Sequence, residues 1–340
     1  MPTAPLTLTR ARILGHRRRA GSLDARMPMG APSLRRAAWA GLQDSMPRAA
    51  VLSIHARVEG TEPDAWADPA LVQVWGPRFS VFGIAAEDRA VFTLGRLAGD
   101  PAGAKWAVDV ADRLEAFLDG REMKFGEAGK GMGVPHNSLR YGAATGRLLL
   151  RWDGARQPTV RAVPAPEVDP LDAGAELARR YLHVYGPATV PSFAKWAGIG
   201  ARSAATSFDA LAGELLAVRT PIGDAWILSA DEPSLLQAQD KPAPARLLPS
   251  GDSYWLLQGP DRELVVEDEA VRPLLWTPRV WPGALLIDGE VCGTWRRANA
   301  DVSIAPWRSL TAAERAAVES EATALPLPDL AGKLRVRWER

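Results

Sequence analysis

The alternation of apolar and polar positions along the chain predicts helices that are each followed by a pair of short strands. Val51, Ile54 and Val58 recur at the three- and four-residue spacing of an amphipathic helix. Two runs rich in β-branched and aromatic residues follow, LVQVW and SVFGI, with Gly76-Pro77 between them. Helices closed by a β-hairpin are typical of a winged helix, a module that presents one helix and its hairpin to nucleic acid.

The same order of helices and strands recurs twice further along the chain. Val108–Gly120 has the spacing of an amphipathic helix, and Asp153-Gly154 marks the turn of a hairpin that follows it. In the third stretch Gly186-Pro187 ends a helix, two shorter helices follow, and Glu214–Ser229 is predicted to form the next hairpin. The pattern therefore predicts a mainly α fold with β-hairpin wings, an α+β arrangement of tandem winged helices.

Composition places the chain among ordinary globular proteins. It has 340 residues, enough for two or three domains, and 47% are hydrophobic and 24% charged. No stretch approaches the roughly 20 apolar residues of a membrane span, and the arginine-rich N-terminus lacks the apolar core of a secretory signal. Cys292 is the only cysteine, which excludes an internal disulfide and a cysteine-based zinc site. We therefore expect a cytoplasmic protein with no membrane contact.

The net charge gives little sign of DNA binding, and the histidine spacing gives little sign of a metal site. The net charge is +1, whereas a strongly electrostatic DNA binder would carry a basic excess. A neutral total can still hide a basic face that an acidic back balances. His55 falls on an apolar helical face and is expected in the core, and His16, His136 and His183 have no metal-ligand spacing. No metal and no cofactor are expected.

Several motifs together carry a family resemblance. GLQDSMPRAA and VWGPRFSVFGIAAED, followed much later by RLLPSGDSYWLL and IDGEVCGTWRR, resemble the winged-helix DNA-binding family that includes the AlkZ- and YcaQ-type bacterial DNA glycosylases. The family pattern resembles GLQxQxPR, then WxMRGTxH, and the order of the pieces covers about residues 33–340. The resemblance implies tandem winged helices followed by a small C-terminal β-barrel, duplex DNA as partner, and removal of alkylated or crosslinked bases.

The resemblance and the apolar pattern together give the expected domain boundaries. From Pro242 onward short β runs predominate, and Thr311–Leu325 is predicted to be a late helix. The residues before the first unit have few periodic apolar positions, so we expect an arm that is free in solution or touches phosphates. The expected domains are a flexible basic arm at 1–32, winged helices at 33–100, 101–168 and 169–241, and a β-barrel-like domain with a late helix at 242–340.

The resemblance implies a catalytic pair of amides that positions a water against the sugar of the damaged nucleotide. Gln43 matches the first amide and Arg78 matches the arginine of the second motif. Ser45 stands where the second amide is expected, and Phe79 and Phe82 replace a glycine and a histidine. The serine hydroxyl is too short to reach the same point and does not titrate near neutral pH. Gln43 and Ser45 are therefore the candidate catalytic residues of an impaired site.

Basic residues on the predicted hairpins and helices are the candidate phosphate contacts. Trp281, within RVWPG, is predicted to be exposed and suited to stack on a base or to wedge between bases. The candidate DNA-binding residues are Arg78, Arg151, Arg156, Arg161, Lys195, Arg202, Arg296 and Arg297.

Three functions remain open at this point. The first is a winged-helix protein that binds double-stranded or damaged DNA with a degenerate glycosylase motif. The second is an active DNA glycosylase that uses Gln43 with a partner outside the family pattern. The third is a winged-helix protein that contacts other proteins and binds no DNA, which the near-neutral charge favours; its partners are unknown. A continuous basic channel beside Gln43 would distinguish the first two functions from the third.

Overall fold

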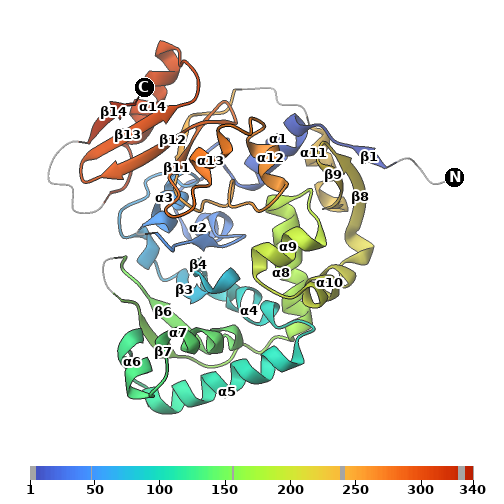
Figure 1. The fold of residues 1–340 in the computed structure, drawn as a ribbon, viewed down its shortest axis with the longest axis vertical. Coiled ribbons are helices and arrows are strands. Elements are labelled where there is room, and N and C mark those ends of the chain that lie inside the picture. The colour runs from blue at the N-terminus through green and yellow to red at the C-terminus, as the bar shows by residue number, and fades with distance from the viewer. Residues whose placement is uncertain (1–4, 47, 155–156, 238–241, 328–333, 340) are drawn as a thin grey trace.

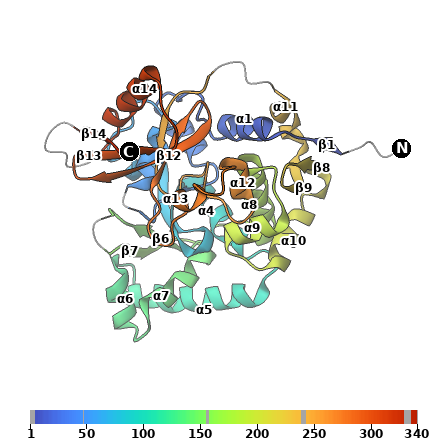
Figure 2. The same cartoon turned by 45° about the horizontal axis from the view of Figure 1, so that its top comes forward.

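The chain folds into a mixed α+β structure with three open sheets. The computed structural model describes residues 5–46, 48–154, 157–237, 242–327 and 334–339. A five-stranded sheet with the last helix lies at one end, and a long helix with its neighbours lies at the opposite end (Figures 1 and 2). The strands β3 (Leu71–Trp75), β4 (Val81–Ala85) and β6 (Leu148–Arg151) and further helices lie between them (Figure 1). Among the described residues, no helix is long and apolar enough to cross a membrane.

The N-terminal residues are part of the folded body, so the expected flexible basic arm over 1–32 is wrong. Strand β1 (Leu6–Thr7) pairs in parallel with β8, and helix α1 (Arg10–Ala20) follows it. Arg17 is buried because its guanidinium donates to the backbone carbonyls of Tyr185 and Gly186. An arginine that the sequence predicts to be in solution can be buried where backbone oxygens accept hydrogen bonds from its N–H groups.

The first two predicted units share one sheet. The two hairpins expected from the sequence are present, β3 with β4 and β6 with β7, and β3 also pairs with β6 at Gln73 and Leu150. The Gln73 amide reinforces this junction, because it accepts from the Trp152 N–H at 2.6 Å and donates to the Trp152 carbonyl at 3.1 Å. The strands lie in the order β2 (Leu42–Gln43), β4 (Val81–Ala85), β3 (Leu71–Trp75), β6 (Leu148–Arg151), β7 (Thr159–Ala162) and β5 (Met123–Lys124).

The helices of the first unit are shorter than the sequence predicts. The helix predicted from Val51, Ile54 and Val58 ends at His55. The helix before it ends at Ala37, and the chain turns back at Gly41, whose φ is +74°, to begin β2. A Cβ at Gly41 would lie 2.8 Å from the Phe82 ring, so close packing requires glycine there. The helices and 3-10 turns are α2 (Ala31–Ala37), α3 (Ala49–His55), η1 (Ala65–Ala67), η2 (Pro77–Phe79), η3 (Ala86–Asp88), α4 (Arg89–Phe92) and η4 (Leu94–Arg96).

Most helices of the second and third units lie close to their predicted positions, although the helix predicted at Val108–Gly120 already begins at Pro101. Gly198, with a φ of +68°, ends α9 as the glycine pattern predicts. Tyr181, Tyr185 and Trp196 pack against one another in the core beside these helices. The elements are α5 (Pro101–Leu118), α6 (Phe125–Gly131), α7 (His136–Leu139), η5 (Arg140–Thr145), α8 (Pro170–Tyr185), α9 (Val190–Ala197), α10 (Ala201–Asp209), η6 (Ala212–Glu214), β8 (Leu215–Thr220), β9 (Gly223–Leu228), η7 (Ser229–Asp231) and α11 (Glu232–Leu236).

The expected C-terminal β-barrel is wrong, because the five strands form an open sheet. Helix α14 packs against both β10 and β14, the two edge strands, and buries one face of the sheet. Because a helix covers the apolar face of the sheet, the five strands do not have to close into a barrel to bury that face. Two short helices also interrupt the region predicted to be mostly strand. The elements are β10 (Arg246–Leu248), α12 (Asp261–Val265), α13 (Arg272–Leu275), β11 (Gly283–Ile287), β12 (Glu290–Ala298), β13 (Asp301–Pro306), α14 (Ala312–Thr323) and β14 (Arg335–Trp338).

A buried ion pair joins α3 to the C-terminal part of the chain. Arg57 donates to both Asp252 oxygens at 2.7 and 2.8 Å, and each residue is only 1% exposed. Asp252 also accepts from the Ser53 hydroxyl and from the Tyr254 N–H. This turn lies in the region predicted to consist mostly of short strands. Burial by itself would raise the pKa of Asp252, and the adjacent Arg57 outweighs it, so the pKa is lowered below its usual value.

Candidate nucleic-acid interface

Gln43 lies at the end of β2 and is held from two sides. Its backbone pairs with Phe82, and its Oε1 accepts from Arg78 Nη2 at 2.8 Å. The second Arg78 amino group donates to the Trp196 carbonyl, which fixes the guanidinium between β2 and α9. A Cβ at Gly251 would lie 3.3 Å from the Gln43 side chain, so the turn after β10 packs against the amide. The amide therefore has a fixed orientation, with its oxygen toward Arg78.

The bend after Gln43 separates Ser45 from Asp44. Gln43 and Ser45 both line a cavity of about 300 Å³, and the Ser45 side chain is exposed. Asp44 points into the protein, where its oxygens accept from the Ala50 N–H at 3.0 Å and from Gln73 Nε2 at 2.9 Å. The aspartate in the motif therefore closes the first turn of α3 and does not line the cavity.

Two aromatic residues that depart from the family pattern lie outside this cavity. Phe82 is fully buried against Gly41 and Gly76, on the inner side of the sheet. Phe79 stacks on the guanidinium of Arg96 and lines a different cavity. The space beside Gln43 is therefore not filled by either phenylalanine.

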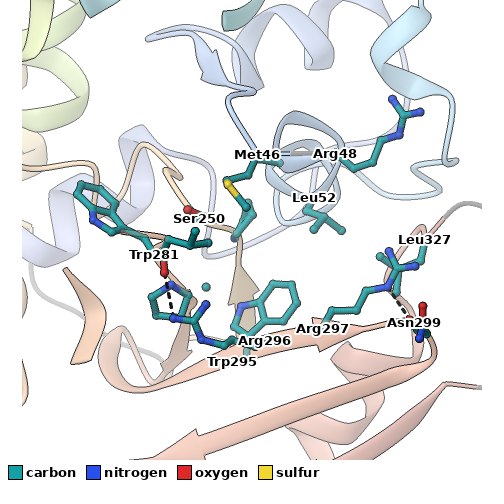
Figure 3. Close-up of a pocket in the computed structure, with 15 residues that line it drawn as sticks. Met46, Arg48, Leu52, Ser250, Trp281, Trp295, Arg296, Arg297, Asn299 and Leu327 are labelled. Atoms are coloured by element: carbon teal, nitrogen blue, oxygen red, sulfur yellow. Dashed lines mark hydrogen bonds between the residues drawn. The ribbon is translucent and has the colours of Figure 1, made fainter. Parts of the chain in front are cut away.

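A second cavity of about 340 Å³ adjoins the first, and the two share Met46, Ser250, Val280 and Trp281 as walls. Figure 3 shows this second cavity between Met46 and Leu52 on one side and the β12 side chains on the other. We call the two cavities together the arginine groove. Its described walls are Gln43, Ser45, Met46, Arg48, Ala49, Leu52, Arg78, Pro249, Ser250, Leu256, Gln258, Arg279, Val280, Trp281, Pro282, Gly283, Trp295, Arg296, Arg297, Asn299 and Leu327.

The arginine groove concentrates positive charge that the total composition conceals. Among the described residues that line it, five are arginines and none is Asp or Glu. Arg296 donates to the Val280 carbonyl at 3.0 Å and Arg297 to the Asn299 carbonyl at 2.7 Å, so backbone oxygens position them (Figure 3). No carboxylate of a described residue forms an ion pair with either arginine. Burial lowers the pKa of Arg78 and of Arg297 from the usual arginine value. Such a groove attracts phosphate.

Trp281 forms part of the wall shared by both halves of the arginine groove. It is half-buried, so the predicted exposure is partly confirmed. Its ring centroid lies 5.3 Å from that of Trp255, and its Nε1 donates to the Thr277 carbonyl at 2.9 Å. The indole is thus fixed from behind and presents its remaining surface to the groove, as a stacking platform requires.

The structure brings only some of the predicted phosphate contacts together. Arg78, Arg296 and Arg297 lie in the arginine groove. Arg151 and Arg161 line a separate cavity of about 150 Å³ beside Trp66 and Glu122. The remaining predicted cations lie elsewhere: Lys195 lines a cavity with Asp224 and Asp261, Arg202 is exposed at the start of α10, and Arg156 is outside the described residues.

Two arginines of the groove were missed at the sequence level. Arg48 directly follows the proline of the GLQDSMPRAA motif, and the family pattern contains an arginine at that place. Its guanidinium carbon lies 5.0 Å from the Trp66 ring centroid. Arg279 precedes Trp281 by two residues and is exposed. In both cases the sequence signal that could have identified the arginine was its closeness to a residue already chosen as a candidate.

The fold also unites two histidines that are far apart in the sequence. His16 and His183 meet Asp231, with their ligand atoms within 4.8 Å of one another. His183 Nδ1 bonds Asp231 at 2.8 Å, and His16 Nε2 bonds the His183 carbonyl at 3.0 Å. The Arg36 cation lies 3.2 Å from His183 Nε2. This arrangement is a hydrogen-bond network, and the adjacent guanidinium opposes a second cation there.

The free energy of unfolding should depend on pH through Asp44, which lies in the bend that carries Gln43 and Ser45. Burial raises the pKa of Asp44 from 3.8 to about 6, so the folded state binds this proton more tightly than the unfolded state. Protonated Asp44 stabilises the folded state fully at pH values below the pKa of this carboxyl in the unfolded state. This stabilisation is lost as the pH rises through the pKa of the folded state. Relative to Asp44→Asn, the wild-type free energy of unfolding should fall by about 2–3 kcal/mol from about pH 4 to about pH 6.

Urea denaturation of both proteins across this pH range measures that difference. Above about pH 6 the two curves should run parallel, because the carboxylate is then ionised in both states. A difference that grows with pH would contradict the raised pKa. The constant offset between the proteins carries no information on titration, because the amide introduced by Asp44→Asn also changes the contact with Gln73.

Among known proteins, this chain is similar to a solved structure and to a curated protein. The structure of the Streptomyces sahachiroi DNA glycosylase AlkZ aligns with 98% of this chain and 100% of that chain, with a TM-score of 0.77 and 18% identity, which shows a shared fold. The Interstrand DNA cross-link repair glycosylase of Streptomyces sahachiroi is 27% identical over 173 residues. That match spans 50% of this chain and 46% of the relative, about half of each.

The family assignment rests on a longer match. The model of the family described as DNA glycosylase AlkZ-like matches residues 36–326. This range contains the Gln43 bend, nearly all of the arginine groove, and the strands from β2 to β13. The resemblance of the short motifs and the shared fold agree with this match, and the chain belongs to the AlkZ-like DNA glycosylase family.

Proposed function

We propose that this protein binds duplex DNA, including damaged duplex, through the arginine groove. The observation that carries the proposal is the set of five arginines beside Gln43, with no carboxylate among the described lining residues. Each arginine that reaches a phosphate releases condensed counterions, which supplies most of the sequence-independent affinity. Arginines line the cavities next to Gln43, as the DNA-binding interpretation expects, so we favour DNA over the protein-interaction alternative.

Three further features support a duplex as the ligand. The helix–hairpin order along the chain fits three winged helices, and we propose that they and the open C-terminal sheet flank the DNA. Trp281 offers an aromatic face within the groove, suited to a base displaced from its stack. Arg296 and Arg297 project from one strand, β12, so they can follow neighbouring phosphates of one backbone.

A second candidate function is base excision. One observation favours it: Gln43 is held by Arg78 at the wall of the groove, where a displaced nucleotide would lie. The Streptomyces sahachiroi relative is called an interstrand DNA cross-link repair glycosylase. The substrate class would then be alkylated or crosslinked bases. Ser45 does not titrate near neutral pH and Asp44 faces inward, so we expect any excision to be slow.

The DNA-binding proposal is tested with Arg279→Ala and Arg297→Ala. Each change should weaken binding to duplexes of unrelated sequence by a similar factor and reduce the slope of log affinity against log salt by roughly one unit, because one phosphate contact is lost. Fluorescence anisotropy at several salt concentrations gives both quantities.

Two control variants test whether the loss of duplex affinity is specific to the arginine groove. Arg12→Ala removes an exposed charge on α1, far along the chain from the groove residues, and should leave both affinity and slope unchanged. Arg202→Ala tests α10 as an additional contact in the same experiment. Duplex binding that does not respond to either groove variant, or no duplex binding at low salt, would reject the proposal and support protein contact instead.

A further inference from the structure

Arg96 is a buried cation. It lies in η4 and is 5% exposed, and its side chain makes no hydrogen bond or ion pair to any described residue. Its Nε and Nη1 are both enclosed and unsatisfied. Burial, and after it the charge of Arg78, lowers the pKa of Arg96 to about 10, so the side chain still carries its charge at neutral pH. Buried charges of this kind are normally paired.

The Arg96 side chain lines a cavity of about 240 Å³ that is separate from the arginine groove. Its guanidinium carbon lies 3.9 Å from the centroid of the Phe79 ring. A guanidinium stacked on a ring keeps its N–H groups at the edge of the plane, so an acceptor that enters in that plane can accept from them. Trp106 and Tyr141 complete the aromatic part of the wall.

A helix N-terminus adds a second attraction for negative charge. The turn Gly198–Gly200, which precedes α10, lines the same cavity. Gly200 is the N-cap of α10 and has no side chain to accept from the first-turn N–H groups. These groups and the helix dipole favour an anion. At the other helix on this cavity, α5, the carboxylate of Asp100 already accepts from the Gly103 N–H at 2.9 Å.

We propose that this cavity binds a phosphate group, held by the edge of the Arg96 guanidinium and by the N-terminus of α10. A phosphate matches both donors, because its oxygens accept two parallel N–H bonds from arginine and further bonds from backbone amides. The group comes either from a DNA backbone or from a free phosphate compound, and the two sources share this chemistry.

The site is linked to the Gln43 bend through two consecutive residues. Arg78 and Phe79 both have left-handed φ angles, 55° and 54°. Arg78 lines the arginine groove and Phe79 lines the Arg96 cavity. A phosphate beside Arg96 offsets the repulsion between Arg96 and Arg78, so it also stabilises the arginine that orients Gln43.

Thermal unfolding in inorganic phosphate is the primary test. At constant ionic strength, replacing chloride with phosphate should raise the Tm of the wild type in a saturable way, because a ligand of the folded state stabilises it. Arg96→Met should abolish this rise, and its Tm without phosphate should be equal to or above that of the wild type, because an unpaired buried charge is gone. Arg12→Met is the matched control and should respond as the wild type does.

Asp100→Asn gives a gain-of-function variant that keeps the fold intact. Asparagine caps a helix as well as aspartate does, so α5 retains its bond to the Gly103 N–H. Loss of the negative charge from the cavity should tighten phosphate binding by roughly threefold to tenfold. This variant keeps the test decisive if Arg96→Met fails to fold. A wild type without a saturable response, or equal responses of all variants, overturns the proposal.

The duplex affinity of the same variants distinguishes a DNA phosphate from a free phosphate compound as the ligand. If a DNA phosphate occupies the site, Arg96→Met should reduce duplex affinity and lower the salt slope by roughly one unit. If the source is a free phosphate compound, duplex affinity should be unchanged while the inorganic-phosphate response is still lost. The phosphate response does not depend on the proposed function, so loss of duplex binding in the groove variants would leave this site standing.

Discussion

Single-turnover excision from a duplex that carries an N7-alkylated purine is expected to be slow or absent for the wild type and faster for Ser45→Gln. The resemblance implies that two amides hold one water, and of the two positions only Gln43 carries an amide here. Restoring the second amide should recover up to about 10²–10⁴-fold in rate, a barrier change of ~3–5 kcal/mol. The structure makes room for this change, because Ser45 is exposed in the same cavity as Gln43 and neither Phe79 nor Phe82 lines that cavity.

The double variant Gln43→Ala with Ser45→Gln is the control for this prediction. It should excise as slowly as the wild type, because a water clamp needs both amides. Duplex affinity should stay near the wild-type value in all three proteins, so a change in rate is separable from a change in binding. Fast wild-type excision that Gln43→Ala abolishes would refute the impaired-site proposal and establish Gln43 as the catalytic residue of an active glycosylase.

Asp252→Ala is expected to cause the largest loss of stability. Arg57 is 1% exposed, and its charge would remain buried without a counterion. Breaking such a pair costs about 3–5 kcal/mol. The loss should also weaken DNA binding, because the Asp252 turn holds Ser250 in the arginine groove and Gly251 against Gln43. Urea denaturation measures the first effect and duplex affinity the second.

Two comparison variants identify the buried charge as the cause. Asp252→Leu combined with Arg57→Met removes both charges and should recover most of the lost stability, because two apolar side chains replace a desolvated pair. Asp224→Ala breaks the exposed pair with Arg219 on β8 and β9 and should leave the midpoint almost unchanged. A double variant as unstable as Asp252→Ala would show that the hydrogen-bonded turn, and not the charge, dominates.

Local sequence patterns predicted the regular elements of the middle of the chain well. The helices α5, α8, α9 and α10 and the three hairpins are located where apolar spacing and glycine or proline signals indicate. The α1 segment was read as an arm because its buried face contains Arg17 and Arg18, whose burial depends on contacts made only after folding. The barrel was expected from resemblance, and α14 instead covers an open sheet. Both errors arise from contacts between distant segments.

The sequence by itself determined the family pattern, the two candidate residues Gln43 and Ser45, and most of the helix and hairpin positions, because these depend on neighbouring residues. Only the tertiary structure decided where charge accumulates. Arg48, Arg279 and Arg297 come from three separate parts of the chain, and a net charge of +1 gives no sign that they share one groove. Burial and proximity are properties of the packed chain, and they decide which cations lie together to attract phosphate.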